Sequence, residues 1–211
     1  MLLQAFVHRS YLNENPRFRL SHNERLEFLG DAVLELAVTE YLYAKYPEKP
    51  EGELTSYRAA LVNAKMLAEI GTDLEINPHL MLSRGEAKDN GRARQYLLAN
   101  AMEALIGAIY LDQGYDISRA FIVERILARL PDVIEKKLFR DPKSLFQEVA
   151  QDKIGITPSY EVIKESGPDH NRIFIVGLYL KDELVAEGEG HSKQAAEVNA
   201  AEKGLLAKRW N

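Results

Sequence analysis

The 211-residue chain contains no cysteine, no long apolar run and no excess of positive charge. The lack of cysteine excludes disulfides, thiolate nucleophiles and cysteine-based zinc sites, and it fits a reducing compartment. No apolar stretch approaches the roughly 20 residues that span a bilayer, and the first residues lack the basic start of a signal peptide. We therefore expect a cytoplasmic protein with no membrane partner.

The net charge of -5 argues mildly against a nucleic-acid partner, so any such binding has to rely on local basic clusters. One cluster lies in a segment rich in Gly, Asp and Asn that reads as an irregular loop. Another lies near the C-terminus. The two clusters comprise Arg84, Lys88, Arg92 and Arg94, and Lys193, Lys203 and Lys208.

The hydrophobic periodicity changes once along the chain and predicts two domains. The first part is helical throughout, with Asn23 as the expected N-cap of a long helix and a further helix over Glu53–Ile70. The second part reads as a short helix, three strands and a last helix. We expect an all-α domain over 1–138, a short linker at 139–141 and a small α+β domain (α-β-β-β-α) over 142–211.

Three acidic residues, Glu24, Glu27 and Asp31, follow one another on the first long helix at spacings of three and four. At 100° per residue they fall within about 60° of one another, so their carboxylates share one face. The opposite face is apolar. This pattern also fits the solvated side of an ordinary amphipathic helix, and spacing alone does not separate the two interpretations.

A second helix carries a different signal, because Leu97–Leu111 is apolar, Gly or Tyr at every position except Asn100 and Glu103. A helix that is apolar all round is buried, and a buried ionised glutamate is costly unless a cation or a donor partners it. Asn100 and Glu103 lie one turn apart on one face, which is a spacing suited to ligands. The alternative is an ion pair between Glu103 and an arginine of another helix.

If the two polar faces meet, Glu27, Asp31, Asn100 and Glu103 form an all-oxygen cluster with Glu24 beside it. Oxygen ligands favour hard cations, here Mg²⁺ with Mn²⁺ as a substitute. Such a site can activate a water and stabilise charge on the leaving oxygen of a phosphodiester. The predicted chemistry is metal-assisted hydrolysis.

Four longer motifs follow one another along the chain: HRSY at His8–Tyr11, HNERLEFLGDAVL at His22–Leu34, EGELT at Glu51–Thr55 and LLANAMEALIGAIYLD at Leu97–Asp112. Together they resemble ribonuclease III, the endonuclease of double-stranded RNA. The C-terminal α-β-β-β-α pattern resembles a double-stranded-RNA-binding domain, so the resemblance covers nearly the whole chain.

The resemblance implies roles for individual residues. Glu27, Asp31 and Glu103 match the family's metal cluster, with Asp31 and Glu103 most directly tied to hydrolysis and Glu24 as an additional acid. Phe28 matches an aromatic residue that inserts into a partner subunit, which implies a homodimer with two sites flanking one RNA-binding valley. Each site would cut one strand, leaving 5′-phosphates, 3′-hydroxyls and a short 3′ overhang. The substrates implied are ribosomal RNA precursors and structured messages.

One position departs from the family pattern, because Asn100 stands where aspartate is usual. An amide oxygen can still bind Mg²⁺ or hold a metal-bound water, but it brings no charge, so we expect weaker metal affinity. This change and the net acidity support a rival hypothesis, a non-catalytic protein that binds double-stranded RNA. A third and weaker hypothesis is a ribosome-associated structural protein.

Three places in the C-terminal domain are candidates for binding duplex RNA, whose shape, 2′-hydroxyls and phosphates are read in preference to its bases. Each has a plainer alternative, such as an exposed loop histidine at position 170 or an ordinary serine N-cap at 192. Gln194 stands where the family has a second basic residue. The candidates are Gln147 and Glu148 on the short helix, Pro168 and His170 in the following loop, and Ser192, Lys193 and Gln194 at the last helix.

Overall fold

The computed structural model describes residues 1–88, 91–168 and 172–210, with Arg92 described by its backbone only. The chain divides into two compact units, Met1–Phe139 and Arg140–Asn211, and each is described by itself. None of the helices in the described ranges is long and apolar enough to cross a membrane.

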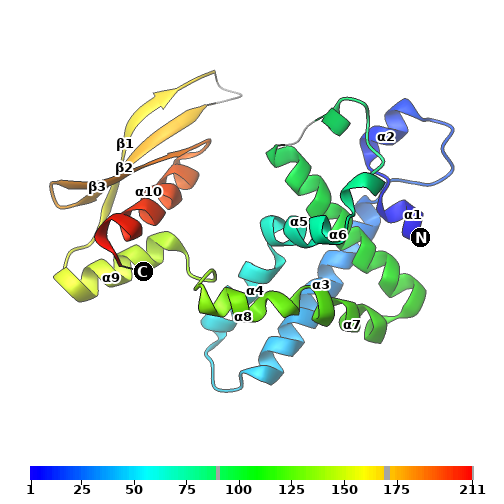
Figure 1. Cartoon of the computed structure of the whole chain (residues 1–211), viewed down its shortest axis with the longest axis horizontal. Helices are drawn as coiled ribbons and strands as arrows, with labels where there is room; N and C mark the ends of the chain where they lie inside the picture. Colours follow the sequence, from blue (N-terminus) through cyan, green and yellow to red (C-terminus); the bar gives the residue numbers. More distant parts are fainter. Residues whose placement is uncertain (89–90, 169–171, 211) are drawn as a thin grey trace. The chain divides into compact units, whose positions relative to one another are not determined.

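The first unit is all-helical, as predicted. Figure 1 shows α3 and α6 running through its centre, with α1 and α2 beside one end of them. Short 3₁₀ turns at Asn77–His79, Glu86–Lys88 and Leu127–Arg129 complete the connections. The helices are α1 (Leu2–Ala5), α2 (Arg9–Glu14), α3 (Glu24–Lys45), α4 (Glu51–Val62), α5 (Ala64–Asp73), α6 (Arg92–Gln113), α7 (Tyr115–Arg125) and α8 (Leu130–Glu135).

Two glycines explain why α3 and α6 pack so closely. A Cβ atom at Gly30 would lie 1.7 Å from the carbonyl oxygen of Glu103, and one at Gly107 would lie 2.2 Å from that of Leu26. Any side chain at either glycine would push the two backbones apart. Both helices also bury side chains in the main core, Leu34 from α3 and Met102 from α6.

Two details of the helical unit differ from the sequence prediction. The helix expected over Glu53–Ile70 is two helices that are separated at Asn63, whose backbone is extended. The Asn63 side-chain amide forms hydrogen bonds with backbone groups of both helices. Its Nδ2 donates to the carbonyls of Ala59 and Ala60, and its Oδ1 accepts from Met66 N–H at 3.0 Å, so it caps α5.

The second difference is at the start of α3. Asn23 lies at the N-cap position, but its side chain makes no capping hydrogen bond. Instead Asn23 is buried, and its Nδ2 donates to the carbonyl of Ala5 at 3.0 Å. The asparagine therefore fastens α1 to α3 and does not cap its own helix.

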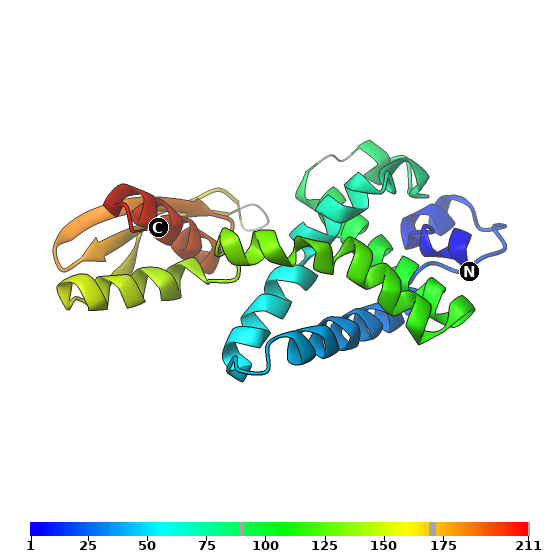
Figure 2. The same ribbon diagram turned by 60° about the horizontal axis from the view of Figure 1, so that its bottom comes forward.

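The second unit has the predicted α-β-β-β-α order. The antiparallel sheet has the strand order β1-β2-β3, and α10 packs against β2, β3 and α9, as Figures 1 and 2 show. Phe146, Leu178 and Leu205 form its separate core. The elements are α9 (Pro142–Ile154), β1 (Ser159–Ser166), β2 (Ile173–Leu180), β3 (Glu183–Gly190) and α10 (Lys193–Lys208).

Candidate active site and RNA-binding residues

The close contact of α3 and α6 brings their acidic residues together. Gly30 lies between Glu27 and Asp31 on α3, and its backbone touches that of Glu103 on α6. Asp31 is exposed, while Glu27 and Glu103 are half-buried. The predicted convergence of acids from two separate stretches of chain is therefore present in the fold.

The electrostatic state of Glu103 shows how tightly the acids are coupled. Burial raises the pKa of Glu103 to about 7, and the negative charges of Asp31 and Glu27 add to the effect. Burial also raises the pKa of Glu27, with Glu24 and Asp31 raising it further and His8 opposing them. Without a cation, the cluster would hold a proton near neutral pH.

His8 acts on Glu27 electrostatically, but no described residue pairs directly with the carboxylates of this cluster. Among the described residues, no Lys, Arg or His forms an ion pair with Glu27, Asp31 or Glu103, so the alternative of a Glu103–arginine bridge is wrong. Glu24 differs, because it lies 3.6 Å from His22 Nδ1 and 4.0 Å from Arg9 Nη1. A desolvated set of acids without a protein cation is the environment that a divalent cation stabilises.

The described side chains do not form a complete metal-coordination site by themselves. Within the described ranges, no group of three or more His, Asp or Glu side chains is close enough to hold a metal ion. This still fits Mg²⁺, which keeps several waters and takes one or two carboxylates together with substrate phosphate oxygens. Asn100, half-buried one turn before Glu103, is placed to add an amide oxygen.

Sequence reasoning missed the surroundings of the acid cluster. His8 acts on the charge of Glu27 from the start of α2, although the sequence indicated no role for it. The glycine pair Gly30 and Gly107 also escaped notice. A glycine inside a strongly helical pattern signals a close backbone approach, and that signal was available in the sequence.

The exposed face of α3 carries large apolar side chains. Phe28 is 81% exposed, Leu36 51% and Tyr43 76%. Beside Tyr43, the end of α3 and the start of α4 line a pocket of about 470 Å³, mainly with Leu42, Tyr46 and Leu54. Apolar side chains this exposed, next to an apolar pocket, indicate a surface that is covered in the working protein.

In the second unit, the candidate RNA contacts lie at the surface. Gln147 and Glu148 are exposed on α9, where they line a shallow polar hollow with Ser144 and Gln151. Glu148 also lies 3.9 Å from Arg140 Nη1. Pro168 is exposed after β1, whereas His170 lies outside the described residues.

The start of α10 combines a capping and a charged residue. The Ser192 hydroxyl accepts from Ala195 N–H at 3.1 Å, so the serine is an N-cap as its plainer interpretation held. Lys193 and Gln194 are exposed, and the Lys193 ammonium lies 5.9 Å from the centre of the Phe174 ring. The remaining N–H groups and the helix dipole favour an anion here.

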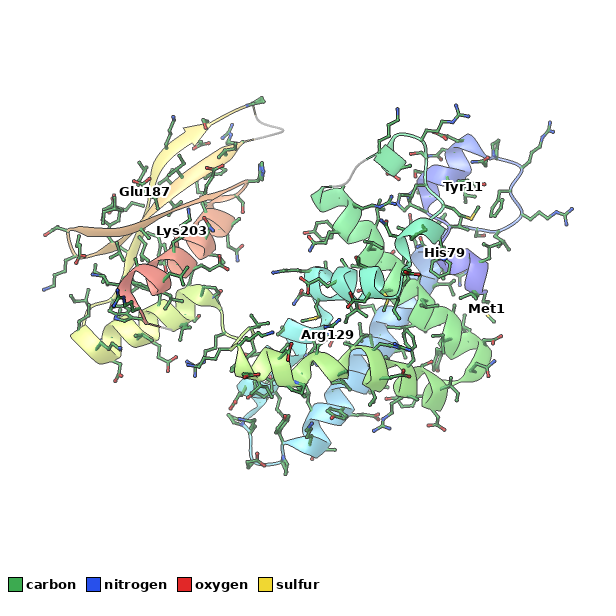
Figure 3. The ribbon with its side chains drawn as sticks, in the orientation of Figure 1. Met1, Tyr11, His79, Arg129, Glu187 and Lys203 are labelled. Atoms are coloured by element: carbon green, nitrogen blue, oxygen red, sulfur yellow. The ribbon has the colours of Figure 1, made fainter. Side chains whose placement is uncertain are left out.

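In both basic clusters predicted from the sequence, some of the cations are hydrogen-bonded or ion-paired within the protein. Lys203 donates to the carbonyl of Glu187 at 3.0 Å, and Figure 3 labels both residues; Lys208 pairs with Glu183. In the other cluster, Arg94 donates through Nε to Asn77 Oδ1. Among the cations of these two clusters, Lys193, Arg84 and Lys88 are exposed and form no ion pair with a described residue.

Comparison with known proteins agrees with this anatomy. Residues 1–130 match the family model described as Ribonuclease-III-like, and residues 142–207 match the double-stranded RNA binding motif. These matches define the class: a helical nuclease domain followed in the chain by a domain that binds double-stranded RNA.

Individual relatives narrow the class further. The chain is 45% identical to "Ribonuclease 3" of Desulforamulus reducens over 95% of its length and 82% of the relative. It is 45% identical to that of Enterococcus faecalis over 97% of its length and 89% of the relative. The nuclease domain of ribonuclease III from Campylobacter jejuni superposes with a TM-score of 0.54 at 40% identity, covering 62% of this chain and 87% of that one. The chain belongs to the ribonuclease III family, whose members are endonucleases of double-stranded RNA.

Proposed function

We propose that the chain hydrolyses phosphodiester bonds of double-stranded RNA with Mg²⁺ held by the acid cluster, and that Mn²⁺ can substitute. The observation that carries this proposal is the burial of Glu103 and Glu27, whose pKa values are raised further by the charge of Asp31, with no ion-pair partner among the described residues. A protein that only bound RNA would gain nothing from burying mutually repelling acids beside a polyanion. Nothing in the comparisons favours that non-catalytic alternative.

In this mechanism Asp31, Glu103, Glu27 and the Asn100 amide oxygen would hold the ion, with Asp31 and Glu103 most directly tied to hydrolysis and Glu24 beside them. A divalent ion held there would activate a water and stabilise charge at the leaving oxygen. Attack of a water on phosphorus would break the bond between phosphorus and the 3′ oxygen. The products would be a 5′-phosphate and a 3′-hydroxyl. Because protonated Glu103 is a poor ligand, we expect metal binding to weaken as the pH falls below about 7.

The second unit would bind the duplex without reading its sequence. Gln147 and Glu148 can hydrogen-bond 2′-hydroxyls, and Ser192, Lys193 and Gln194 present backbone N–H groups and one charge to a phosphate. Pro168 and His170 belong to the loop proposed for a minor groove. We place the linker between the two domains at 139–141.

We further propose a homodimer formed through α3. The description of the solved Campylobacter jejuni nuclease domain names a region involved in dimer formation. Phe28 lies eight residues before Leu36 and Tyr43 seven after it, about 12 Å and 10 Å along the helix, and all three fall within about 80° of one another. In a two-fold pair of antiparallel α3 helices centred on Leu36, Phe28 of one protomer reaches the pocket beside Tyr43 of its partner.

The RNAs that we expect as substrates are ribosomal RNA precursors and structured messages. The relatives are bacterial proteins. Bacterial RNA is made and processed in the cytoplasm, which is the compartment that we propose.

The direct test is incubation with long duplex RNA and Mg²⁺, beside single-stranded RNA and duplex DNA of the same sequence. We expect internal cuts in the duplex RNA alone, with 5′-phosphate ends that accept ligation. Binding of duplex RNA with no cuts under any divalent ion would leave the non-catalytic hypothesis as the better one.

Asn100→Asp is expected to lower the Mg²⁺ concentration that gives half-maximal cleavage, roughly fivefold, because a carboxylate adds charge to the cation site. The measurement is a Mg²⁺ titration of the initial rate. Gln113→Glu, which adds the same charge at the far end of α6, is the matched control and should leave the titration unchanged. An unchanged titration for Asn100→Asp would show that position 100 is not a ligand.

Deletion of residues 141–211 is expected to weaken duplex binding by about 100-fold or more at moderate salt, because the phosphate contacts of the second unit are lost. The first unit has its own core and retains the acid cluster, so cleavage at low salt should persist. Binding curves and initial rates at several salt concentrations test both halves of this expectation. Complete loss of low-salt cleavage would contradict the proposed division of labour.

A further inference from the structure

The short helix α2 is held in place by polar contacts that the proposed chemistry does not use. None of its six residues is buried, and a helix of this length does not persist alone in water. Tyr11, labelled in Figure 3, packs edge-on against the ring of Phe18. Apart from the pair between Arg9 and Glu24, the long-range side-chain hydrogen bonds described for α2 lead to the loop that precedes α6.

Ser10 is the centre of these contacts. Its hydroxyl donates to the carboxylate of Glu86 and accepts from Ser83 N–H at 3.0 Å. The same Glu86 carboxylate lies 2.9 Å from Nδ1 of His8, the N-cap residue of α2. One serine side chain thus joins two points of the loop to one end of the helix.

The other end of α2 is joined to the loop as well. Both carboxylate oxygens of Glu14 accept from the backbone N–H of Arg84, each at 3.2 Å. We name His8, Ser10, Glu14 and Glu86 the α2 latch. The latch is hydrogen-bonded to loop positions 83, 84 and 86. Because these positions are close together, the loop cannot move there without breaking the hydrogen bonds of the latch.

The latch lies next to the acid cluster. His8 N–H donates to the carbonyl of Met81 at 3.0 Å, and Asn23 N–H donates to the carbonyl of Val7 at 2.8 Å, which links the loop to the start of α3. His8 also acts electrostatically on Glu27, in the direction that lowers the pKa of that carboxyl. The loop is therefore anchored beside the residues that hold the cation.

The loop carries two exposed cations. Arg84 and Lys88 are exposed, and no acidic side chain of the described residues pairs with either. In an acidic protein, unpaired cations next to an acid cluster are suited to phosphates that approach that cluster. A cation on a fixed loop also loses less conformational entropy on binding than one on a loose loop.

We propose that the α2 latch positions Arg84 and Lys88 to bind the phosphate backbone of the duplex beside the acid cluster, with Ser10 and Glu86 as positioning residues. This inference rests on the proposed function. Ser10 and Glu86 make no described contact with the metal ligands or with the buried core of the unit. Loss of the latch should therefore weaken RNA binding and spare the chemical step.

The test uses the full chain with Ser10→Ala and Glu86→Gln, and measures KM and kcat on a short duplex and Kd for the same duplex in EDTA. Each substitution is expected to raise KM and Kd about fivefold, the effect of losing one hydrogen-bonded anchor, and to leave kcat within about twofold. Ser10→Thr, which keeps the hydroxyl, should restore both. In an Arg84→Ala/Lys88→Ala background, Ser10→Ala should have no further effect.

Two results would overturn the inference. One is an unchanged KM and Kd for Ser10→Ala and Glu86→Gln. The other is a full additional loss in the background without the two cations, which would mean that the latch acts through general stability. If the unaltered chain does not cut RNA, the proposed function fails, and the Kd values in EDTA still decide whether the latch positions the loop.

Discussion

Glu103→Gln is expected to lower kcat on duplex RNA by about 1000-fold or more while leaving Kd for the duplex nearly unchanged. The substitution removes a charged oxygen ligand, and charge stabilisation by a bound divalent ion is worth several kcal/mol in the transition state. Glutamine has nearly the shape of glutamate, so the packing of α6 is kept. Single-turnover cleavage with Mg²⁺ and filter binding in EDTA measure the two quantities.

Glu135→Gln is the matched control for this variant. Glu135 is an exposed residue of α8, and its substitution removes the same charge without touching the cluster. It should cut at the rate of the unaltered chain. A Glu103→Gln variant that cut within tenfold of that rate would show that Glu103 is not part of the catalytic site.

Glu103→Gln lowers activity but should raise the stability of the metal-free fold. The sign of this stability effect follows from the raised pKa of Glu103. The folded chain holds the Glu103 proton up to about pH 7, whereas an unfolded glutamate, with its ordinary pKa of 4.5, loses it at lower pH. Stability is therefore lost as the pH rises between these values, and above pH 7 the carboxylate destabilises the metal-free fold. At pH 8 in EDTA, Glu103→Gln should melt higher than the unaltered chain, and Mg²⁺ should narrow or reverse the difference.

Phe28→Ala is expected to dissociate the dimer. An apolar residue buried at the centre of an interface typically contributes about 2 kcal/mol, and two-fold symmetry applies the substitution twice, so the dimer Kd should rise by about 1000-fold. Sedimentation across a concentration series measures the change. Paired cuts on opposite strands should fall with the fraction of dimer, because each protomer supplies one site.

Ile117→Ala serves as the control for the dimer variant, since Ile117 is 52% exposed on α7 and lies outside the α3 face. It should leave the sedimentation profile unchanged. A Phe28→Ala chain that still sediments as a dimer would locate the interface elsewhere, and equal dissociation by both variants would show that the effect is not specific to α3.

The elements that follow strong local signals could be predicted from the sequence. The uninterrupted apolar stretch of α6 indicated a buried helix, and the change of hydrophobic periodicity indicated the α-β-β-β-α order of the second unit. The break at Asn63 could not be predicted in the same way. It depends on one amide group that serves both flanking helices, and helical periodicity continues across it.

The candidate site shows the same division between local and tertiary information. Spacing placed Glu27 and Asp31 on one face and marked Glu103 as an anomaly in an apolar helix. It did not show which faces meet. That depends on the backbone contact at Gly30 and Gly107, and the loss of Lys203 and Arg94 from the basic clusters likewise depends on tertiary contacts.

The most direct measurement is to locate a divalent ion in crystals grown with Mn²⁺, using its anomalous scattering. We predict a peak between α3 and α6 with oxygen atoms of Glu103 and Asp31 as direct ligands, lost in Glu103→Gln crystals grown in the same way. A peak bound elsewhere while the cluster stays empty, or a Glu103 carboxylate paired with a guanidinium, would contradict the claim that these acids form the centre that cuts RNA.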